Sequence, residues 1–544
     1  MPTNQEAAEL FRAIADILDV LGERFKPEAY RRASRSIESL TEDLADVAAR
    51  NELRTIPGVG DAIEEKIREY LTTGRLDYYE RLQREVPPGI LELLRVPGLG
   101  PKTARRFWLE LGVEGPKELA DAIRAGRLTG VKGFGPKKVE QIRLALAAAA
   151  GPTAGARLPI EDAYPIAQRL VAGLRAAGGI EQIELAGSFR RSRETVGDLD
   201  VLVTSADPER VFDAFSRLPE VKEVRLRGGT KETVVLSRGL QVDLRVVEPA
   251  AFGAAWLYFT GSKDHNVHLR SIARDRGLKI NEYGIFRGDA RVGGRTEAEV
   301  YAALDLAWIP PELREDRGEI DAAAKGPLPP LVERSDLRGD LHCHLPADAT
   351  AADVDRVVAA ARARRFAYVG VVVAGERADG RRSRAPTTAL DRLAAVRSSG
   401  LALGRAVEVG PSGLPDEWKD LRPDYLIARP TTAAPTPSGT LAGAVVAHVG
   451  GDAPAKLWVA AARSAGAAIE LGPGAERLDS TAARAARDAG VALLLPTGLG
   501  RPDDDPTEAV ALGFARRAGA GASAVANAAD AARVTRSWSG PRRA

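Results

Sequence analysis

The chain has 544 residues, which is long enough for several domains, each with its own core. Hydrophobic residues make up 44% of the sequence, so wholesale disorder is disfavoured, and the absence of any run of 18 apolar residues argues against a membrane-spanning helix. The formal charge is only +2, from 77 Lys and Arg against 75 Asp and Glu, so nucleic-acid binding would have to come from locally arranged groups.

The first residues, MPTNQEAAELFRAI, form an amphipathic helical pattern that differs from the basic and apolar stretches of a signal segment. The single cysteine, Cys343, excludes an internal disulfide framework and a cysteine-rich zinc site. We therefore expect a soluble, cytoplasmic protein without a membrane partner.

A weak internal repeat follows, as TIPGVGDAIEEKI from Thr55, RVPGLGPKTARRF from Arg95 and GVKGFGPKKVEQI from Gly130. Each segment has a Gly-x-Gly turn and then a helical pattern, whose first N–H groups are unsatisfied and can receive a phosphate. The segments resemble helix-hairpin-helix motifs that bind DNA backbones; the alternative is a set of packed α-hairpins. The predicted backbone contacts are Gly58, Gly60, Gly98, Gly100, Lys102, Gly133, Gly135 and Lys137.

Residues 151–160, GPTAGARLPI, are predicted to be a linker, and residues 165–178 show a helical pattern. From residue 183 to 247 short β-branched runs alternate with glycine turns, which predicts a sheet. The predicted hairpin at residues 223–236 is short and leaves no room for a long insertion.

Gly187 and Ser188 stand where one predicted strand ends and a helix begins. A bare backbone, a hydroxyl group and a helix N-terminus meet there, where a triphosphate fits. Arg191, one turn later, has the planar fork that binds phosphate oxygens.

Asp198 and Asp200 flank one residue of a predicted strand and therefore point to the same face. Asp243 lies in a second predicted strand, QVDLRVV, so neighbouring strands would bring three carboxylates together. Such a cluster suits Mg²⁺, and two ions ~3.5–4 Å apart can hold an attacking and a leaving oxygen in line for phosphoryl transfer. The alternative is a capped helix followed by an exposed strand edge.

The segments GSFRR, ETVGDLDVLV and VDLRVV, followed by YFTGSKDHNVHLR from Tyr258 and INEYGIF from Ile280, resemble the palm of the X-family DNA polymerases. The resemblance extends over approximately residues 1 to 320. It implies a DNA-directed DNA polymerase that adds dNMP to a primer 3′-hydroxyl, with Mg²⁺ or Mn²⁺ as two ions in the palm.

The resemblance also implies roles for single residues. Asp198, Asp200 and Asp243 would be the catalytic metal ligands, and Asp243 would also draw the proton from the primer 3′-hydroxyl. Arg245 would lie beside the primer terminus and Arg270 would face the template. The implied nucleotide-binding residues are Gly187, Ser188, Arg191, Gly197, Tyr258, Phe259, Gly261 and Asn266.

The N-terminal helical segments 11–40 and 63–70 resemble the lyase domain of the same family, in which a lysine forms a Schiff base with an abasic sugar. Lys66 stands at the matching position, and Ala62 replaces a second lysine of the family. Since Glu64 and Glu65 precede Lys66, we expect a raised pKa, which works against a Schiff-base role. A lysine that contacts the DNA backbone is the alternative.

Residues 323–338 are rich in proline and unperiodic, which predicts a second linker, and an Ala-rich alternation of helices and short strands follows. The motif DLHCHL places His342 and His344 on one strand face as candidate metal ligands, and it resembles the opening of PHP (polymerase and histidinol phosphatase) domains. Such domains bind up to three metals and act as phosphoesterases.

Most further ligands of that family are predicted to be missing here. Val373 and Ala374 stand where the family has Asp and His, and Ala406 stands where we expect its glutamate. Other ligand places fall on Thr431, Gly498 and Gly500, and His448 is a third candidate. Because two-metal hydrolysis needs bridging carboxylates, we expect 3′→5′ exonuclease activity to be lost and no zinc to be bound. The alternative is one weakly bound zinc ion on the two strand histidines and one distant histidine.

The predicted fold class is multidomain α+β, with a helical helix-hairpin-helix region, a mixed-sheet nucleotidyltransferase palm and a C-terminal PHP-like α/β domain that forms a distorted βα barrel. The predicted domains are a lyase-like domain at 1–85, helix-hairpin-helix elements at 86–150, the palm at 151–250, a nucleotide and base-pair-binding subdomain at 251–322, a linker at 323–338 and the PHP-like domain at 339–544.

We predict short-gap filling in DNA repair, such as base excision repair, by a monomer that binds gapped or primed double-stranded DNA and dNTPs, with a DNA ligase as a candidate partner. Two alternatives remain. One is a nuclease or phosphoesterase that uses the residual PHP positions, and the other is a noncatalytic DNA-binding scaffold.

Overall fold

The computed structural model of the chain divides into two compact units, residues 1–156 and 157–544. It describes residues 4–38, 44–94, 96, 99–131, 134–149, 157–237, 239–345, 348–376, 382–385, 387–396, 401–409, 415–421, 423–428, 445–446, 455–472, 478–499, 501 and 505–536. The helices in these ranges include none long and apolar enough to cross a membrane.

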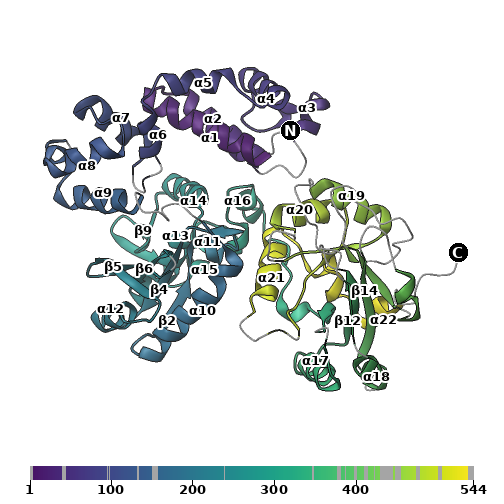
Figure 1. Ribbon diagram of the computed structural model, residues 1–544. Helices are drawn as coiled ribbons and strands as arrows, with labels where there is room; N and C mark the ends of the chain where they lie inside the picture. Colours follow the sequence, from purple (N-terminus) through teal and green to yellow (C-terminus); the bar gives the residue numbers. More distant parts are fainter. Residues whose placement is uncertain are drawn as a thin grey trace. The chain divides into compact units, whose positions relative to one another are not determined.

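The first unit is helical and shares one apolar core (Figure 1). Its helices are α1 (Asn4–Leu21), α2 (Lys26–Glu38), α3 (Leu44–Ala49), α4 (Asp61–Thr73), α5 (Asp77–Arg84), α6 (Pro88–Leu93), α7 (Pro101–Leu111), α8 (Pro116–Arg124) and α9 (Pro136–Ala149). Helices α4, α7 and α9 each begin directly after the second glycine of a Gly-x-Gly segment, so the helix after each turn is confirmed.

The second unit begins with the palm, by which we mean residues 157–250. Its elements are β1 (Leu158–Pro159), α10 (Ile160–Ala177), β2 (Gln182–Leu185), α11 (Gly187–Arg190), β3 (Thr195–Val196), β4 (Asp198–Thr204), α12 (Pro208–Ser216), β5 (Val221–Arg227), β6 (Lys231–Leu236) and β7 (Gln241–Val246). Helix α10 starts five residues before the predicted position and contains Pro165 in its interior, where proline cannot donate to the carbonyl four residues earlier.

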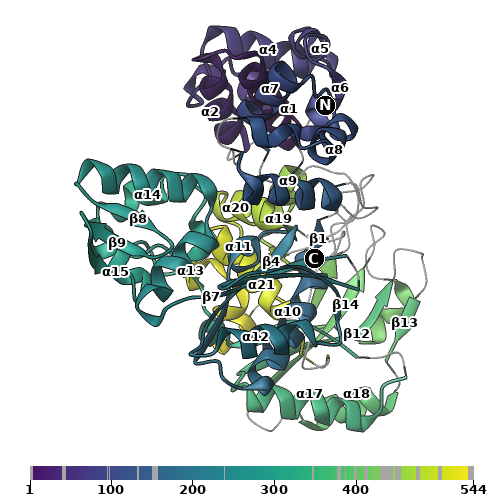
Figure 2. The same ribbon diagram turned by 90° about the vertical axis from the view of Figure 1, so that its left-hand side faces the viewer.

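A mixed five-stranded sheet of order β2-β4-β7-β6-β5 forms the palm. Leu199, Val201 and Val203 of β4 face α10 and α12 in one core, whereas Leu202 packs on the other side with Phe252. Figure 2 shows α10 and α12 on one side of this sheet and α11 on the other. The period-two alternation explains why a buried strand carries two aspartates on its second face.

Residues 251–322 are predicted to bind the nucleotide and the base pair, and we call them the base-pair subdomain. They add helices around a small sheet of order β10-β9-β8. Its elements are α13 (Phe252–Thr260), α14 (Lys263–Asp275), β8 (Lys279–Asn281), β9 (Gly284–Arg287), β10 (Ala290–Gly293), α15 (Glu297–Ala302) and α16 (Glu319–Ala323). A separate apolar cluster that includes Leu257, Leu269 and Tyr301 forms its core.

The C-terminal domain, residues 339–544, contains a sheet of order β11-β12-β14-β15-β16-β17-β18 in which these strands pair in parallel and β13 pairs antiparallel with β12. Helices surround the sheet (Figure 1). Its elements are β11 (Gly339–His344), α17 (Ala351–Ala363), β12 (Tyr368–Glu376), β13 (Arg382–Arg384), α18 (Thr387–Val396), β14 (Ala402–Val409), β15 (Tyr425–Ala428), β16 (Val445–Val446), α19 (Ala455–Ala465), β17 (Ala468–Glu470), α20 (Ser480–Asp488), β18 (Leu493–Leu494), α21 (Thr507–Arg517) and α22 (Ala531–Arg536). This confirms the expected alternation of helices and short strands.

The segment 323–338, which we expected to be a linker, lies against the C-terminal domain. Val332 is fully buried in that domain's core, and its backbone N–H donates to the carbonyl of Ala520 at 2.8 Å. Prolines prevent regular structure in this segment without preventing burial of its few apolar side chains.

Candidate active site

The three predicted metal ligands lie together on one face of the palm sheet. Strands β4 and β7 are parallel neighbours, and Asp200 stands directly opposite Asp243 in their register. Asp198 lies two residues earlier on the same face of β4. The strand pairing thus brings the three carboxylates together as predicted.

The pKa values of Asp198 and Asp200 are raised. Burial raises the pKa of Asp200 to about 7, and the charges of Asp198 and Asp243 act in the same direction. Burial and then Asp243 also raise the pKa of Asp198. A group of carboxylates that resists full ionisation on its own has the donor chemistry of a site for hard divalent cations such as Mg²⁺.

Three side chains that the sequence analysis missed contact Asp243. The Lys231 ammonium pairs with one of its oxygens, and the Thr233 hydroxyl donates to the other at 2.9 Å. The amide of Gln241 donates to that second oxygen at 3.2 Å. Lys231 and Thr233 alternate with buried residues on β6, so a period-two pattern opposite Asp243 was the available signal.

Gly187 brings the start of α11 against the carboxylate cluster. Its φ angle is +63°, and a Cβ atom at this position would lie 2.4 Å from Oδ2 of Asp200. The preceding N–H, that of Ala186, donates to the Asp200 carbonyl at 2.9 Å. Only glycine allows this approach, so the Gly187-Ser188 turn and the carboxylates form one site.

Arg191 lies beside another predicted nucleotide-binding residue. Its guanidinium donates to the Thr260 carbonyl and, through Nε, to Glu315 at 3.1 Å. A Cβ atom at Gly261 would lie 3.1 Å from Nη1 of Arg191. The structure therefore joins α11 to the end of α13, where Gly261 has a φ of +73°.

The aromatic pair on α13 is also held in place. The Tyr258 and Phe259 rings meet edge to face with centroids 5.1 Å apart, and the Arg245 guanidinium lies 4.2 Å from the Phe259 centroid. The Asn266 amide donates to the Tyr258 carbonyl at 2.7 Å. Arg270, also on α14, is exposed, and Gly197 directly precedes β4.

In the first unit, open glycine turns precede the helices of the repeat. An added Cβ atom at Gly60, Gly100 or Gly135 would meet no atom within 4 Å, whereas at Gly58, whose φ is +90°, it would lie 2.8 Å from Arg32. Lys102 is exposed. Gly98 and Gly133 lie outside the described residues, as does the side chain of Lys137.

Lys66 on α4 differs from the expectation in its electrostatics. Burial lowers its pKa, although Glu65 acts in the opposite direction. Glu64, which we expected to raise the pKa, is instead paired with Arg68 at 2.9 Å. The expectation of a raised pKa is therefore wrong, because the helix packing desolvates Lys66 and Glu64 has its own cation.

The surroundings of Lys66 are partly aromatic. Its Nζ donates to the Ala62 carbonyl at 2.8 Å and lies 4.6 Å from the centroid of the Tyr78 ring. The ring of Tyr30, on α2, stacks on Tyr78 at 6.1 Å between centroids. Lys26 is exposed, and its charge contributes to lowering the pKa of Lys66.

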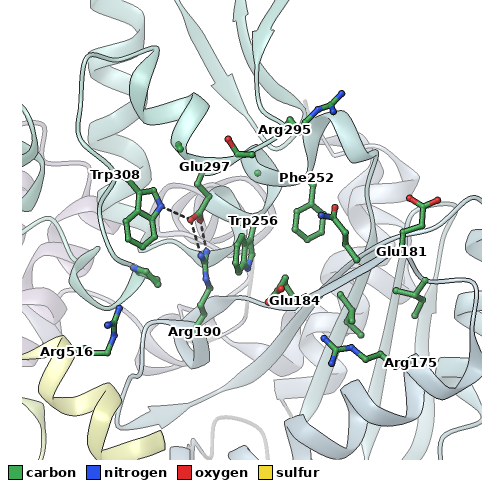
Figure 3. A pocket seen from close by; sticks show the side chains of 17 residues that line it. Arg175, Glu181, Glu184, Arg190, Phe252, Trp256, Arg295, Glu297, Trp308 and Arg516 are labelled. Carbon is green, nitrogen blue, oxygen red and sulfur yellow. Dashed lines mark hydrogen bonds and ion pairs between the residues drawn. The ribbon is translucent and has the colours of Figure 1, made fainter. Parts of the chain in front are cut away.

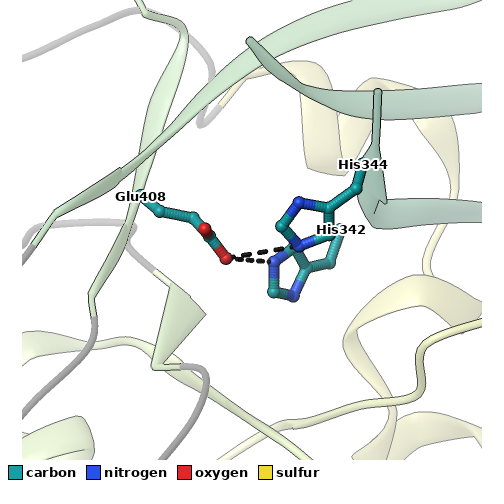
Figure 4. A group of neighbouring side chains, drawn as sticks. All are labelled: His342, His344 and Glu408. Atoms are coloured by element: carbon teal, nitrogen blue, oxygen red, sulfur yellow. Dashed lines mark hydrogen bonds and ion pairs between the residues drawn. The ribbon is translucent and has the colours of Figure 1, made fainter. Parts of the chain in front are cut away.

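A second cluster lies in the C-terminal domain. Figure 4 shows His342 and His344 directed at Glu408, whose Oε1 is 2.8 Å from Nε2 of His342 and 3.3 Å from Nε2 of His344. One ligand atom from each residue lies within 4.8 Å of the others. The expected glutamate is thus present as Glu408, two residues after Ala406, and our placement of it was wrong.

Glu470 binds the other ring nitrogen of His342. One of its carboxylate oxygens lies 2.6 Å from Nδ1 of His342, while Nε2 of the same ring faces Glu408. Although burial alone would lower it, the two glutamates raise the pKa of His342 to about 9. A carboxylate on the far ring nitrogen is the usual partner of a metal-bound histidine, so the donor set fits one zinc ion.

The remaining PHP positions provide little more. Val373 and Ala374 are buried apolar residues, and Gly498 lies in a turn. Thr431, Gly500 and His448 lie outside the described residues. Asp340, which precedes His342 on β11, is bound by the Thr497 hydroxyl and by the His342 N–H at 2.6 Å.

Family models match three parts of the chain. Residues 2–76 match a helix-hairpin-helix domain, residues 90–148 match a SAM-like helix-hairpin-helix tandem, and residues 255–315 match the DNA polymerase beta thumb. The DNA polymerase/3′-5′ exonuclease PolX of Bacillus subtilis (strain 168) is 35% identical over 346 residues, which are 62% of this chain and 59% of that protein. This part of the chain is similar to X-family DNA polymerases.

Two eukaryotic relatives are more distant. DNA polymerase lambda of Rattus norvegicus is 27% identical over 345 residues, covering 57% of this chain and 56% of that protein. DNA polymerase lambda of Arabidopsis thaliana is 26% identical over 346 residues, covering 57% and 62%. The chain thus spans about three fifths of the length of these relatives.

Proposed function

We propose that the protein is a DNA-directed DNA polymerase that fills short gaps during DNA repair in the cytoplasm, at the nucleoid. The observation that carries this proposal is the pairing of Asp200 with Asp243 beside Asp198 and Gly187. The family of the matched part supports the reaction class, namely transfer of dNMP to a primer 3′-hydroxyl.

The carboxylates would hold two divalent ions, Mg²⁺ or Mn²⁺, which neutralise the triphosphate and activate the primer hydroxyl. Asp243, oriented by Thr233, would accept the proton of the primer 3′-hydroxyl. Ser188 and Arg191 would bind the triphosphate, and Arg245 would lie at the primer terminus.

Base and sugar recognition would come from the base-pair subdomain. Tyr258 and Phe259 offer an aromatic surface to the sugar, and Asn266 would reach the minor-groove side of the new base pair. Arg270 is exposed and would face the template. The short β5–β6 hairpin supports templated extension over tailing.

DNA would be held through its backbone by the glycine turns of the first unit, with Lys102 as an exposed cation. Gapped or primed double-stranded DNA and dNTPs are the proposed substrates, a monomer is the proposed state, and a ligase is the proposed partner that seals the product.

The test uses a one-nucleotide-gapped, 5′-phosphorylated DNA with Mg²⁺ or Mn²⁺. Wild type is compared with Asp198→Ala and, separately, with His342→Ala for primer extension and primer shortening. We expect templated extension that Asp198→Ala abolishes, with no shortening in any lane. Shortening that survives Asp198→Ala and disappears with His342→Ala would identify a nuclease instead, and DNA binding without extension would identify a scaffold.

The cluster of His342, His344 and Glu408 supports a smaller second proposal, a single zinc ion in the C-terminal domain. Since Val373 and Ala374 offer no ligand atoms, a bridged two-metal centre is not proposed. Co²⁺ replacing Zn²⁺ should bind in one equivalent with the visible absorption of a tetrahedral site, and Glu408→Ala should remove that absorption. An unchanged spectrum in Glu408→Ala would exclude this site.

A further inference from the structure

The predicted nucleotide helix α11 and the loop after it are packed against the C-terminal domain. Phe189 lies against the apolar core that includes Val510 and Phe514 of α21. Gly513 of α21 lies so close to the loop that a Cβ atom there would be 2.5 Å from Oγ of Ser192. The loop, in which Ser192 has a φ of +52°, is therefore in direct contact with α21.

Arg517, at the end of α21, contacts the same loop. Its side chain is 3% exposed, and Nη1 donates to the Arg191 carbonyl at 3.2 Å. Its Nε lies 3.8 Å from Glu194, which also accepts a hydrogen bond from the Ser480 hydroxyl. One C-terminal side chain thus contacts both ends of the segment 191–194.

Glu315 of the base-pair subdomain completes a buried charge cluster. Its Oε1 accepts from Nη1 of Arg517 at 2.7 Å and from Nε of Arg191 at 3.1 Å, and Arg193 lies 3.9 Å from its other oxygen. Burial alone would raise the pKa of Glu315, but these arginines, Arg517 first, lower it to about 2. Glu315 is thus a buried anion shared between Arg191 and Arg517.

The opposite side of α11 contacts the base-pair subdomain rather than the core of the C-terminal domain. Arg190 forms a two-pronged pair with Glu297 at 2.6 and 3.0 Å, next to a cavity of about 830 Å³ (Figure 3). Buried Arg314 also pairs with Glu297. The backbone of α11 therefore keeps an anchor in the base-pair subdomain when the contacts of Arg517 are removed.

We propose that Arg517 is a positioning residue of the nucleotide site. Through Arg517, the C-terminal domain holds Arg191 in position to bind the triphosphate. The proposal rests on the proposed polymerase function. In a buried site a carboxylate needs a cation, and Arg517 meets that need for Glu315. Without Arg517, the charge of Glu315 would be balanced by Arg191 and the more distant Arg193, and the site would offer less positive charge to an incoming triphosphate.

The experiment uses full-length variants on one-nucleotide-gapped DNA with a template cytosine. Binding of dGTP is measured by titration calorimetry with Ca²⁺ and a dideoxy-terminated primer, and extension kinetics are measured with Mg²⁺. Arg517→Ala should raise both the Kd and the KM for dGTP about tenfold and change kcat less than about twofold. Arg517→Lys, which keeps the charge and loses the fork, should lie between it and wild type.

The second variant tests the charge argument directly. Adding Glu315→Gln to Arg517→Ala removes the uncompensated carboxylate and should restore dGTP binding to within about threefold of wild type. Arg364→Ala is the matched control, since Arg364 pairs with Glu508 at 3.0 Å within the C-terminal domain. It should leave Kd and KM unchanged.

Equal dGTP affinity in wild type and Arg517→Ala would overturn the proposal, and so would an equal loss in Arg364→Ala. Thermal melting shows whether Arg517→Ala folds. If it does not fold, the proposal would be overturned by an Arg517→Lys variant that binds dGTP as tightly as wild type and whose dGTP affinity does not change when Glu315→Gln is added. Wild type that binds dGTP without extending the primer would refute the polymerase function alone, whereas absence of dGTP binding would refute both.

Discussion

Asp200 on β4 and Asp243 on β7 are paired residues of two parallel strands, in a sheet whose opposite face is fully apolar at these strands. The pairing brings like charges together at a place where burial already disfavours charge. Such an arrangement costs stability unless cations are bound, and it concentrates negative charge where two metal ions are proposed.

Replacing Asp200 should increase the stability of the metal-free protein and remove its stabilisation by Mg²⁺. Asp200→Asn removes one of the repelling carboxylates, so the metal-free protein should gain about 1 kcal/mol in the free energy of unfolding. The same variant should lose extension activity by more than about 100-fold and lose the rise in Tm that Mg²⁺ produces in wild type. Thermal melts with EDTA and with Mg²⁺ check this. A preserved Mg²⁺ response would contradict the assignment of Asp200 as a ligand.

Lys231 should compete with metal for Asp243, because its ammonium pairs with an Asp243 oxygen. Lys231→Ala should therefore lower the Mg²⁺ concentration for half-maximal extension about threefold, while the metal-free protein loses about 1 kcal/mol of stability. Lys222→Ala, at an exposed position of the same hairpin, is the control. A higher Mg²⁺ requirement in Lys231→Ala would mean that the lysine assists the ions.

Glu232 should make stability depend on pH. Its side chain is fully buried on the apolar side of β6, its oxygens have no hydrogen-bond partner among the described residues, and burial raises its pKa to about 7. A carboxyl group with a raised folded-state pKa favours the fold below its unfolded pKa, and this stability is lost as the pH rises to about 7.

Glu232→Gln should thus raise the free energy of unfolding at pH 8 by about 2 kcal/mol and leave it nearly unchanged at pH 4.5. Urea unfolding between these pH values measures the difference. If Arg227, 3.9 Å from Glu232, holds the glutamate ionised, the variant will instead be less stable than wild type at pH 8.

Lys66 should form a Schiff base, since its lowered pKa increases the fraction of neutral amine. Borohydride should trap a covalent adduct between the wild-type protein and DNA with a 5′-deoxyribose phosphate, and Lys66→Ala should reduce the adduct at least about tenfold. Lys117→Ala, at an exposed lysine of α8, should not. An equal adduct in Lys66→Ala, or weaker DNA binding without any adduct, would assign Lys66 to the DNA backbone.

Patterns within one element were readable from the sequence. The alternation in GDLDVLV predicts that Asp198 and Asp200 share a face, and the repeated Gly-x-Gly turns predict the starts of α4, α7 and α9. These features depend on backbone geometry over a few residues, which the local sequence largely determines.

Sequence spacing alone did not predict correctly which residue of a strand faces the site, because the neighbouring strands were not known. The glutamate expected at Ala406 is Glu408, because the partners of β14 decide which of its residues faces His342. The pKa of Lys66 was misjudged for the same reason, since burial by other helices outweighs its neighbours in sequence.

The sequence by itself thus determined the element types, the carboxylate motif and the resemblance of the polymerase part to X-family DNA polymerases. Only the tertiary structure decided which charges balance one another: Lys231 with Asp243, Glu408 with two histidines, and Arg517 with Glu315, which is 202 residues away. The physical reason is that electrostatic interactions and desolvation depend on distance in space, and residues far apart along the chain supply both.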